Sequence, residues 1–261
     1  MVWPLAANLS MLFATEPLPR RVAAAMQAGF AGVEIQFPYD CPAPELQQAL
    51  QQSQMPLVLI NLPAGDLLQG GPGLACVPSR RSDFARALEQ ALAYVERVRP
   101  LRVNVLPGRL DQGLEPAVAL DCLADNLMAA ANAFAELGVG VVCEAINRHD
   151  IPGFLLATAE ELASMLARVA HPNLSAQLDF YHMQRMGIAL PDAVAALAGH
   201  IGHVQFADLP GRGAPGSGQM DFASGFQALA QAGYRGWLAA EYHPAEADFG
   251  WIADWRSQGW I

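Results

Sequence analysis

Short apolar runs and longer amphipathic stretches alternate along the whole chain. Runs of roughly four to eight apolar residues predict buried strands, and stretches with an apolar residue every three or four positions predict helices. The expected strands lie at 5–12, 32–37, 57–62, 102–106, 139–145, 174–179, 203–207 and 237–242. The expected helices lie at 18–28, 44–52, 79–98, 116–137, 158–170, 191–198, 222–232 and 249–257.

This alternation predicts the fold class. Strands that alternate with helices are typical of parallel sheets with crossover helices. Eight such units in 261 residues match a closed (β/α)8 TIM barrel, which takes about 250 residues, better than a doubly wound sheet. No linker or change in composition divides the chain, so we expect an α/β protein with one barrel domain over residues 1–261.

Residues 245–261 are expected to form a C-terminal helical tail rich in tryptophan. Trp251, Trp255 and Trp260 lie in this segment. We expect these tryptophans to be exposed at an interface, which would make the protein a homo-oligomer, or to cover one flank of the barrel.

Composition and charge narrow the classes of partner. The chain is 53% apolar and 15% charged, which is typical of a globular protein with a large core. Its net charge of −10 repels a phosphate backbone and argues against nucleic-acid binding. The most apolar window, 127–146, is interrupted by Asn132, Glu136 and Glu144, which argues against a membrane span. With no signal-peptide pattern at residues 1–10, we expect a cytoplasmic protein.

Polar residues end the last four expected strands or lie within them. They are Glu144, Asp179, Gln205 and Glu241. Any one acid is equally well explained by a strand that meets solvent, but in a barrel the carboxyl ends of the strands converge on the active site. Three converging carboxylates would repel one another unless a cation lay between them. Four oxygen ligands without thiol or imidazole favour Mg²⁺, with Mn²⁺ as the alternative.

Further polar residues follow these four positions closely. Asp150 follows Glu144, His182 follows Asp179, and Arg212 lies in the Gly/Pro-rich loop after Gln205. We expect all three to bind a small anionic substrate, with Arg212 holding its negative charge and His182 acting as a hydrogen-bond donor or a ligand. The long loop 63–78 is a candidate lid over the site. Strand alternation points Cys143 away from the site, so we expect it to be a packing residue.

Several stretches together resemble the hydroxypyruvate isomerase family, a member of the xylose isomerase-like barrels. They are ANLSMLF at 7–13, NLPAGD at 61–66, EAIN at 144–147 with IPGF at 151–154, QLDFYHMQ at 177–184 and EYHP at 241–244. The resemblance runs from about residue 5 to residue 245. It implies that the metal is held at positions 144, 179, 205 and 241. It also implies that Glu144 and Glu241 are the catalytic acid/base residues.

The resemblance implies an isomerase of carbohydrate-acid and glyoxylate metabolism. The expected reaction is the interconversion of hydroxypyruvate and tartronate semialdehyde (2-hydroxy-3-oxopropanoate) by proton transfer through an enediolate. A 2-oxotetronate isomerase and a ketose 3-epimerase on the same fold are the alternatives, and which glutamate is the base stays open. Apurinic-site endonucleases share the barrel, but six scattered histidines and the acidic charge argue against one. A non-enzymatic sugar-acid sensor is the remaining alternative.

Overall fold

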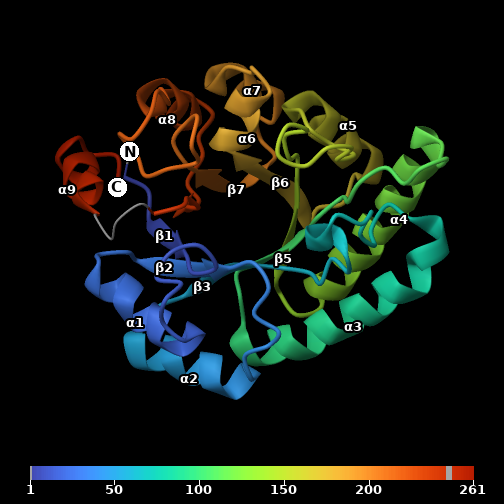
Figure 1. The fold of residues 1–261 in the computed structure, drawn as a ribbon, viewed down its shortest axis with the longest axis horizontal. Coiled ribbons are helices and arrows are strands. Elements are labelled where there is room, and N and C mark those ends of the chain that lie inside the picture. Colours follow the sequence, from blue (N-terminus) through green and yellow to red (C-terminus); the bar gives the residue numbers. More distant parts are fainter. Residues whose placement is uncertain (1, 245–248) are drawn as a thin grey trace.

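Eight parallel strands close into a barrel. The computed structural model describes residues 2–244 and 249–261, and each strand pairs with the next along the chain until β8 pairs with β1 (Figure 1). This confirms the expected (β/α)8 class. The strands are β1 Leu5–Asn8, β2 Gly32–Ile35, β3 Leu57–Asn61, β4 Arg102–Val105, β5 Gly140–Glu144, β6 Leu174–Asp179, β7 Ile201–Phe206 and β8 Leu238–Ala240.

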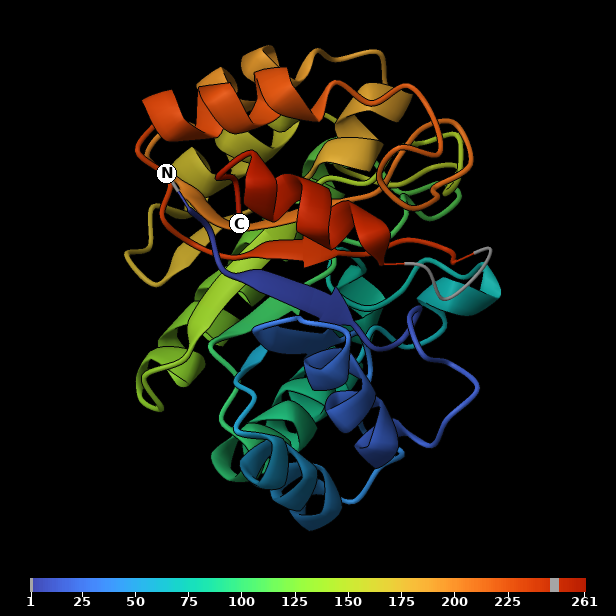
Figure 2. The ribbon, with the colours of Figure 1, turned by 90° about the vertical axis from the view of Figure 1, so that its left-hand side faces the viewer.

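Helices surround this barrel in the expected order (Figures 1 and 2). They are α1 Leu18–Gln27, α2 Ala43–Ser53, α3 Arg81–Val98, α4 Pro116–Ala135, α5 Ala159–Val169, α6 Phe180–Arg185, α7 Leu190–Ala196, α8 Phe222–Gln231 and α9 Gly250–Ser257, with 3₁₀ turns η1 Leu67–Gln69 and η2 Pro78–Arg80. Helix α5 begins with a capping box, because Thr158 Oγ1 accepts from the backbone N–H of Glu161 and the Glu161 carboxylate accepts from the backbone N–H of Thr158. Helix α6 was not expected, since six residues are too few for a helical period to be recognised.

Several strands are shorter than their apolar runs. Strand β1 ends at Asn8, although the run was expected to continue to residue 12. Leu9 and Leu12 are nevertheless fully buried, in the turns that follow. Apolar residues in the loops above the barrel therefore extend the strand pattern without joining the sheet.

The barrel interior and the helix layer have separate apolar clusters. A small cluster made only from strand residues contains Ala6, Val58, Leu59, Val142 and Ala239. Cys143 belongs instead to the large cluster that includes the helices. Burial raises the pKa of the Cys143 thiol far above its usual value, so this residue packs the helix layer as expected.

The tryptophans of the tail are not exposed, contrary to one of the two expectations. Trp251 and Trp255 are buried, and the Trp255 ring lies 4.9 Å from the ring of Phe206 and 5.0 Å from that of Phe226. Helix α9 therefore covers the flank of the barrel beside β1 (Figure 2). The backbone N–H of Trp3 also donates to the carbonyl of Trp260 at 2.9 Å. Residues 245–248, the first part of the expected tail, lie outside the described residues.

The helices within residues 2–244 and 249–261 were compared with the length and hydrophobicity that a membrane span needs. None of them is both long and apolar enough to cross a bilayer.

Candidate active site

The four polar residues expected at the strand ends are all buried at one end of the barrel. Glu144 and Asp179 end β5 and β6, Gln205 is the next-to-last residue of β7, and Glu241 directly follows β8. A cavity of about 120 Å³ lies among them and is lined by Glu144, Gln205 and Glu241. Parallel strands in a common register explain this convergence, since Asp179 lies opposite Gln205 and Glu144 opposite Gln177.

Three of the predicted site residues form a compact group. One side-chain atom each of Glu144, Asp179 and His182 lie within 4.8 Å of one another. The Nε2 of His182 lies 3.5 Å from Oδ2 of Asp179 and 3.9 Å from Oε1 of Glu144. Gln205 and Glu241 line the same cavity, but their side-chain oxygens are bonded to other residues.

The hydrogen bonds of Asn147 determine the tautomer of His182. The Oδ1 of Asn147 accepts from the backbone N–H groups of His149 and Asp150, so its Nδ2 is the donor to Nδ1 of His182 at 2.7 Å. Burial lowers the pKa of His182 to about 4, so the ring is neutral and carries its proton on Nε2. The Nε2–H therefore points at the carboxylates as a donor, and its lone pair is not available to a cation.

Arg212 is the cation that faces these carboxylates. Its Nη2 lies 2.5 Å from Oε2 of Glu241 and 3.5 Å from Oδ2 of Asp179, and its guanidinium lies 5.1 Å from the ring centre of Tyr181. Its Nε is buried and has no hydrogen-bond partner among the described residues. The guanidinium therefore retains an unused donor inside the site.

A residue that the sequence did not identify organises the loop of Arg212. The carboxylate of Asp208, directly after Ala207, accepts backbone N–H groups from Leu209, Gly216, Gly218 and Met220 at 2.8–3.0 Å. One buried carboxylate thus gathers both ends of the loop around Arg212. A single Asp near a Gly/Pro-rich stretch was the only sequence signal for this role.

The two glutamates expected to be catalytic have raised pKa values. Burial is the main cause for both. For Glu144 the nearby charges of Glu241 and Asp179 raise the pKa further. Burial raises the pKa of Glu241 to about 7, although Arg212 acts in the opposite direction. The Oε1 of Glu241 accepts from the side-chain amides of Asn8 and Gln36, both at 2.8 Å.

Asp150 lies at the edge of the site and connects the loop after β5 with α6. It accepts hydrogen bonds from Asn147, from the Tyr181 hydroxyl at 2.9 Å and from Arg185 at 3.2 Å. Burial alone would raise the pKa of Asp150, but these three donors together lower it below its usual value. The carboxylate is thus ionised and tied to both α6 and the loop after β5.

The long loop between β3 and α3 reaches the cavity. Leu67 and Leu68 line it, and the Leu68 side chain is largely exposed at its mouth. Asp66 accepts from the backbone of Gly73 and from Arg80 at 2.7 Å, so the loop is closed by its own contacts. Its action as a lid stays a prediction.

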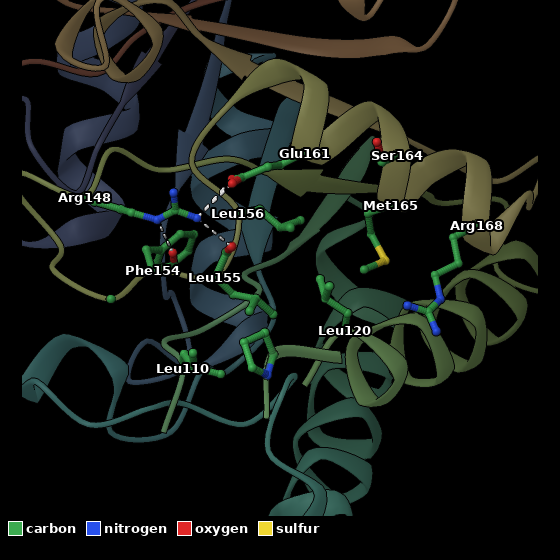
Figure 3. A pocket seen from close by; sticks show the side chains of 12 residues that line it. Leu110, Leu120, Arg148, Phe154, Leu155, Leu156, Glu161, Ser164, Met165 and Arg168 are labelled. Carbon is green, nitrogen blue, oxygen red and sulfur yellow. Dashed lines mark hydrogen bonds and ion pairs between the residues drawn. The ribbon is translucent and has the colours of Figure 1, made fainter. Parts of the chain in front are cut away.

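A second, larger cavity lies away from these carboxylates. It has a volume of about 510 Å³ and is mainly apolar, between α4, α5 and the loop after β5 (Figure 3). Arg148 borders it, donates to the carbonyls of Phe154 and Leu155 and pairs with Glu161. These contacts fix the loop that carries Asn147 and Asp150. Converging acids and amides line the smaller cavity, which makes it the candidate active site.

The donor set of the smaller cavity fits a hard divalent cation. Glu144, Asp179 and Glu241 supply three buried carboxylates, and Arg212 is the guanidinium that contacts two of them. When all three carboxylates are ionised, three negative charges face one positive charge, and a cation would neutralise this surplus. The chemistry of the residues present is therefore compatible with Mg²⁺ or Mn²⁺.

Comparison with known proteins agrees with this barrel fold. A family model described as "Xylose isomerase-like TIM barrel" matches residues 22–258. The chain belongs to this family. It is 37% identical to hydroxypyruvate isomerase of Escherichia coli over 253 residues, which cover 96% of this chain and 98% of the relative. It is 34% identical to 2-oxo-tetronate isomerase of Pectobacterium atrosepticum, with 96% and 97% covered.

Two solved structures superimpose well on this chain. The crystal structure of "AP endonuclease, family 2" from Brucella melitensis has a TM-score of 0.92 and 32% identity, covering 97% of this chain and 99% of that one. A D-psicose 3-epimerase crystallised with D-fructose has a TM-score of 0.78 at 17% identity, with 92% and 84% covered, and shares the fold. The curated relatives confirm the expected enzyme class, an isomerase.

Proposed function

We propose that this isomerase interconverts hydroxypyruvate and tartronate semialdehyde. In this reaction a proton leaves C3 of hydroxypyruvate and a proton is added at C2, while the hydroxyl hydrogen passes from O3 to O2. The observation that carries the proposal is the pair of buried glutamates, Glu144 and Glu241, at one small cavity with raised pKa values.

The two glutamates suit proton transfer at neutral pH. A general base works best when its pKa lies near the pH at which the enzyme works, and the pKa of Glu241 is raised to about 7. One glutamate takes the proton from C3, and the same or the other glutamate returns a proton to C2 through a planar enediolate. Asn8 and Gln36 hold Oε1 of Glu241, which fixes the direction of its carboxyl group.

Two donors are available for the oxygen atoms of the substrate. The unused Nε–H of Arg212 and the Nε2–H of His182 both lie within the site. We assign the substrate carboxylate to Arg212 and a neighbouring oxygen to His182, which would hold the three carbons in register with the glutamates. Asp150 contributes by fixing Tyr181, over which Arg212 lies.

Glu144, Asp179, Gln205 and Glu241 are proposed to hold a divalent metal ion, Mg²⁺ or Mn²⁺. When bound, such an ion would polarise the carbonyl and hydroxyl oxygens of the substrate and so favour loss of the C–H proton. Mg²⁺ and Mn²⁺ prefer oxygen ligands, which all four side chains offer.

A 2-oxotetronate isomerase is the second candidate, because the relative in P. atrosepticum carries that name at similar identity. The cavity of about 120 Å³ is smaller than pockets for drug-sized ligands, which measure roughly 300–1,000 Å³, so its size suits an acid of three or four carbons. The same size argues against six-carbon ketoses. The net charge of −10 still opposes a nucleic-acid substrate of the kind that the name of the B. melitensis protein suggests.

The proposal also includes a setting for the enzyme. We propose a cytoplasmic protein of glyoxylate and carbohydrate-acid metabolism whose partner is a small oxo acid. A homo-oligomer stays a prediction, and its interface would have to use a surface other than Trp251 and Trp255, which α9 buries against the barrel.

Turnover in D₂O tests the proposed function. The protein, supplied with Mg²⁺, is given hydroxypyruvate or 2-oxotetronate. Proton NMR follows deuterium uptake next to the carbonyl for both acids, and the aldehyde signal for hydroxypyruvate, because the four-carbon product is a ketone. We expect tartronate semialdehyde to form from hydroxypyruvate with a higher kcat/KM than the four-carbon acid gives. A higher value for 2-oxotetronate would reverse the assignment, and turnover of neither acid would refute it.

A further inference from the structure

A buried carboxylate that the proposed mechanism does not use lies inside the barrel next to Gln205. Glu34, in β2, is fully buried, and its partners are Asn8 in β1 and His203 and Gln205 in β7. We infer that Glu34 is a positioning residue that fixes which end of the Gln205 side-chain amide faces the active site. This inference rests on the proposed function only where it assigns Gln205 to the metal ion.

The amide of Asn8 shows that Oε1 of Glu34 is an acceptor. The Oδ1 of Asn8 accepts the backbone N–H of Ser10 at 3.0 Å, so the Asn8 nitrogen must face the other way. Its two hydrogens are donated to Oε1 of Glu34 and Oε1 of Glu241, each at 2.8 Å. Oε1 of Glu34 therefore accepts, whatever the position of the hydrogen between Oε2 and Nε2 of His203, which lie 2.7 Å apart.

This acceptor determines the orientation of Gln205. Its Nε2 lies 2.6 Å from Oε1 of Glu34, which leaves its oxygen on the opposite side, where Gln177 donates to it at 2.5 Å. The reverse orientation would bring two oxygen atoms to 2.6 Å and leave a buried acceptor unpaired, which costs more than a hydrogen bond gains. Gln177 itself does not decide the matter, because its own Oε1 has no partner among the described residues and its amide is free to turn.

The orientation matters because the two ends of an amide differ as ligands. Mg²⁺ and Mn²⁺ bind the carbonyl oxygen of an amide and not its NH₂ group. With an acceptor at Glu34, Gln205 presents its oxygen away from β2, on the side where Gln177 lies, and both glutamines line the cavity. Without that acceptor, the Gln205 amide would be able to present either end.

The orientation is testable on the unmodified, metal-free protein. Because Asn8 and Gln205 both donate to Oε1 of Glu34, their side-chain NH₂ protons must be close together. We expect an NOE between the Asn8 Hδ2 and Gln205 Hε2 protons. If both amides are assigned and this NOE is absent, the inference is overturned, with no variant and no metal involved.

Two variants test the consequence by Mn²⁺ titration calorimetry. Glu34→Leu removes the acceptor, and we expect the affinity for Mn²⁺ to fall about 10- to 100-fold, the usual range for a lost partner of a metal ligand. Glu34→Gln keeps one oxygen for Asn8 and Gln205 while its NH₂ group faces His203, so we expect an affinity within about threefold of wild type. Equal affinity for the Leu variant and wild type, or equal losses for both variants, would overturn the inference.

A double-variant cycle separates this role from general stabilisation. In a Gln205→Ala background, Glu34→Leu should change the affinity for Mn²⁺ no further, because Glu34 acts through Gln205. An undiminished loss in that background would contradict the inference. If Glu34→Leu does not fold, the NOE still decides, because its absence alone overturns the inference. A 10- to 100-fold loss of Mn²⁺ affinity in Glu34→Gln would contradict it as well. If wild type itself binds no Mn²⁺, the metal part of the proposed function fails, while the NOE still decides the orientation of Gln205.

Discussion

Asn147 donates its side-chain N–H to Nδ1 of His182 across 2.7 Å, and this contact fixes the imidazole as a donor toward the carboxylates. The direction is imposed from the backbone, because the amide oxygen of Asn147 is already used by two N–H groups of its own loop. The protonation of a residue on α6 is thus decided by the loop after β5.

The first prediction follows from this contact. Asn147→Asp replaces the donor by an acceptor, so the proton of His182 moves to Nδ1 or the ring becomes charged. We expect kcat/KM to fall at least about 10²-fold, in line with the loss of a positioned acid/base or donor group. Nitrogen-15 NMR of the His182 ring measures the tautomer directly. Asn132→Asp, at the exposed contact with His171, is the matched control and should leave turnover unchanged.

Replacing either candidate base tests the proton transfer. Glu144→Gln and Glu241→Gln keep the shape of the side chain but remove the group that takes a proton. We expect kcat/KM to drop about 10²- to 10⁴-fold in each, with the circular dichroism spectrum preserved. Glu136→Gln, at the exposed C-terminal end of α4, is the control and should retain most of the activity. Near-normal turnover in either active-site variant would contradict the assignment.

The pH dependence of stability tests the raised pKa of Glu241. Its folded pKa of about 7 lies above the value near 4.5 expected in the unfolded chain, so the folded protein holds a proton that the unfolded chain releases between these values. Stability of the metal-free protein should therefore fall as pH rises from about 4.5 to 7, by on the order of 3 kcal/mol. Urea unfolding at several pH values measures this slope. Glu241→Gln should flatten it, and an unchanged slope in that variant would refute the cause.

The proposed metal site predicts a second effect on the pH dependence of stability. Saturating Mg²⁺ or Mn²⁺ should stabilise the protein most at neutral pH, where the carboxylates that bind it are ionised, and least near pH 4.5. Thermal unfolding with and without the ion, after treatment with a chelator, measures the difference. Stabilisation that does not change with pH would argue that the ion binds elsewhere.

The aromatic cluster under α9 predicts a large cost for one side chain. Trp255 is 5% exposed and its ring lies close to those of Phe206, Phe222 and Phe226. We expect Trp255→Ala to lower the free energy of unfolding by about 3–5 kcal/mol. Arg256→Ala, which removes an exposed contact to the carbonyl of Gly29, should cost less than about 1 kcal/mol. Similar losses in the two variants would mean that the ring contacts contribute little.

The fold was predictable because its signals are local. Each strand and crossover helix has its own apolar period, and the positions of Glu144, Asp179 and Glu241 at strand ends follow from that period alone. The sequence left open whether the tail tryptophans are exposed or cover the barrel. Trp251 and Trp255 are buried, and the periodicity of the tail does not reveal this, because Trp255 packs against rings from β7 and α8.

The support of the site was much less predictable. Glu34 lies in a strand between Val33 and Ile35, where an acid among apolar residues was a signal, but its partners come from β1 and β7 and meet it only after the barrel closes. Asp208 and Asn147 act on backbone N–H groups, which every residue except proline possesses and no side-chain pattern marks. Such contacts depend on the backbone conformation of a loop, which forms only in the folded protein and leaves no periodic pattern in the sequence.

The backbone bond between Trp3 and Trp260 has a practical meaning. Both residues lie at the floor of the barrel, because Trp3 precedes β1 while the carboxylates follow the strands. An affinity tag or surface anchor joined there would project from the side of the barrel opposite to the side at which substrate enters. The protein is therefore suited to immobilisation through either end with its mouth facing the solution.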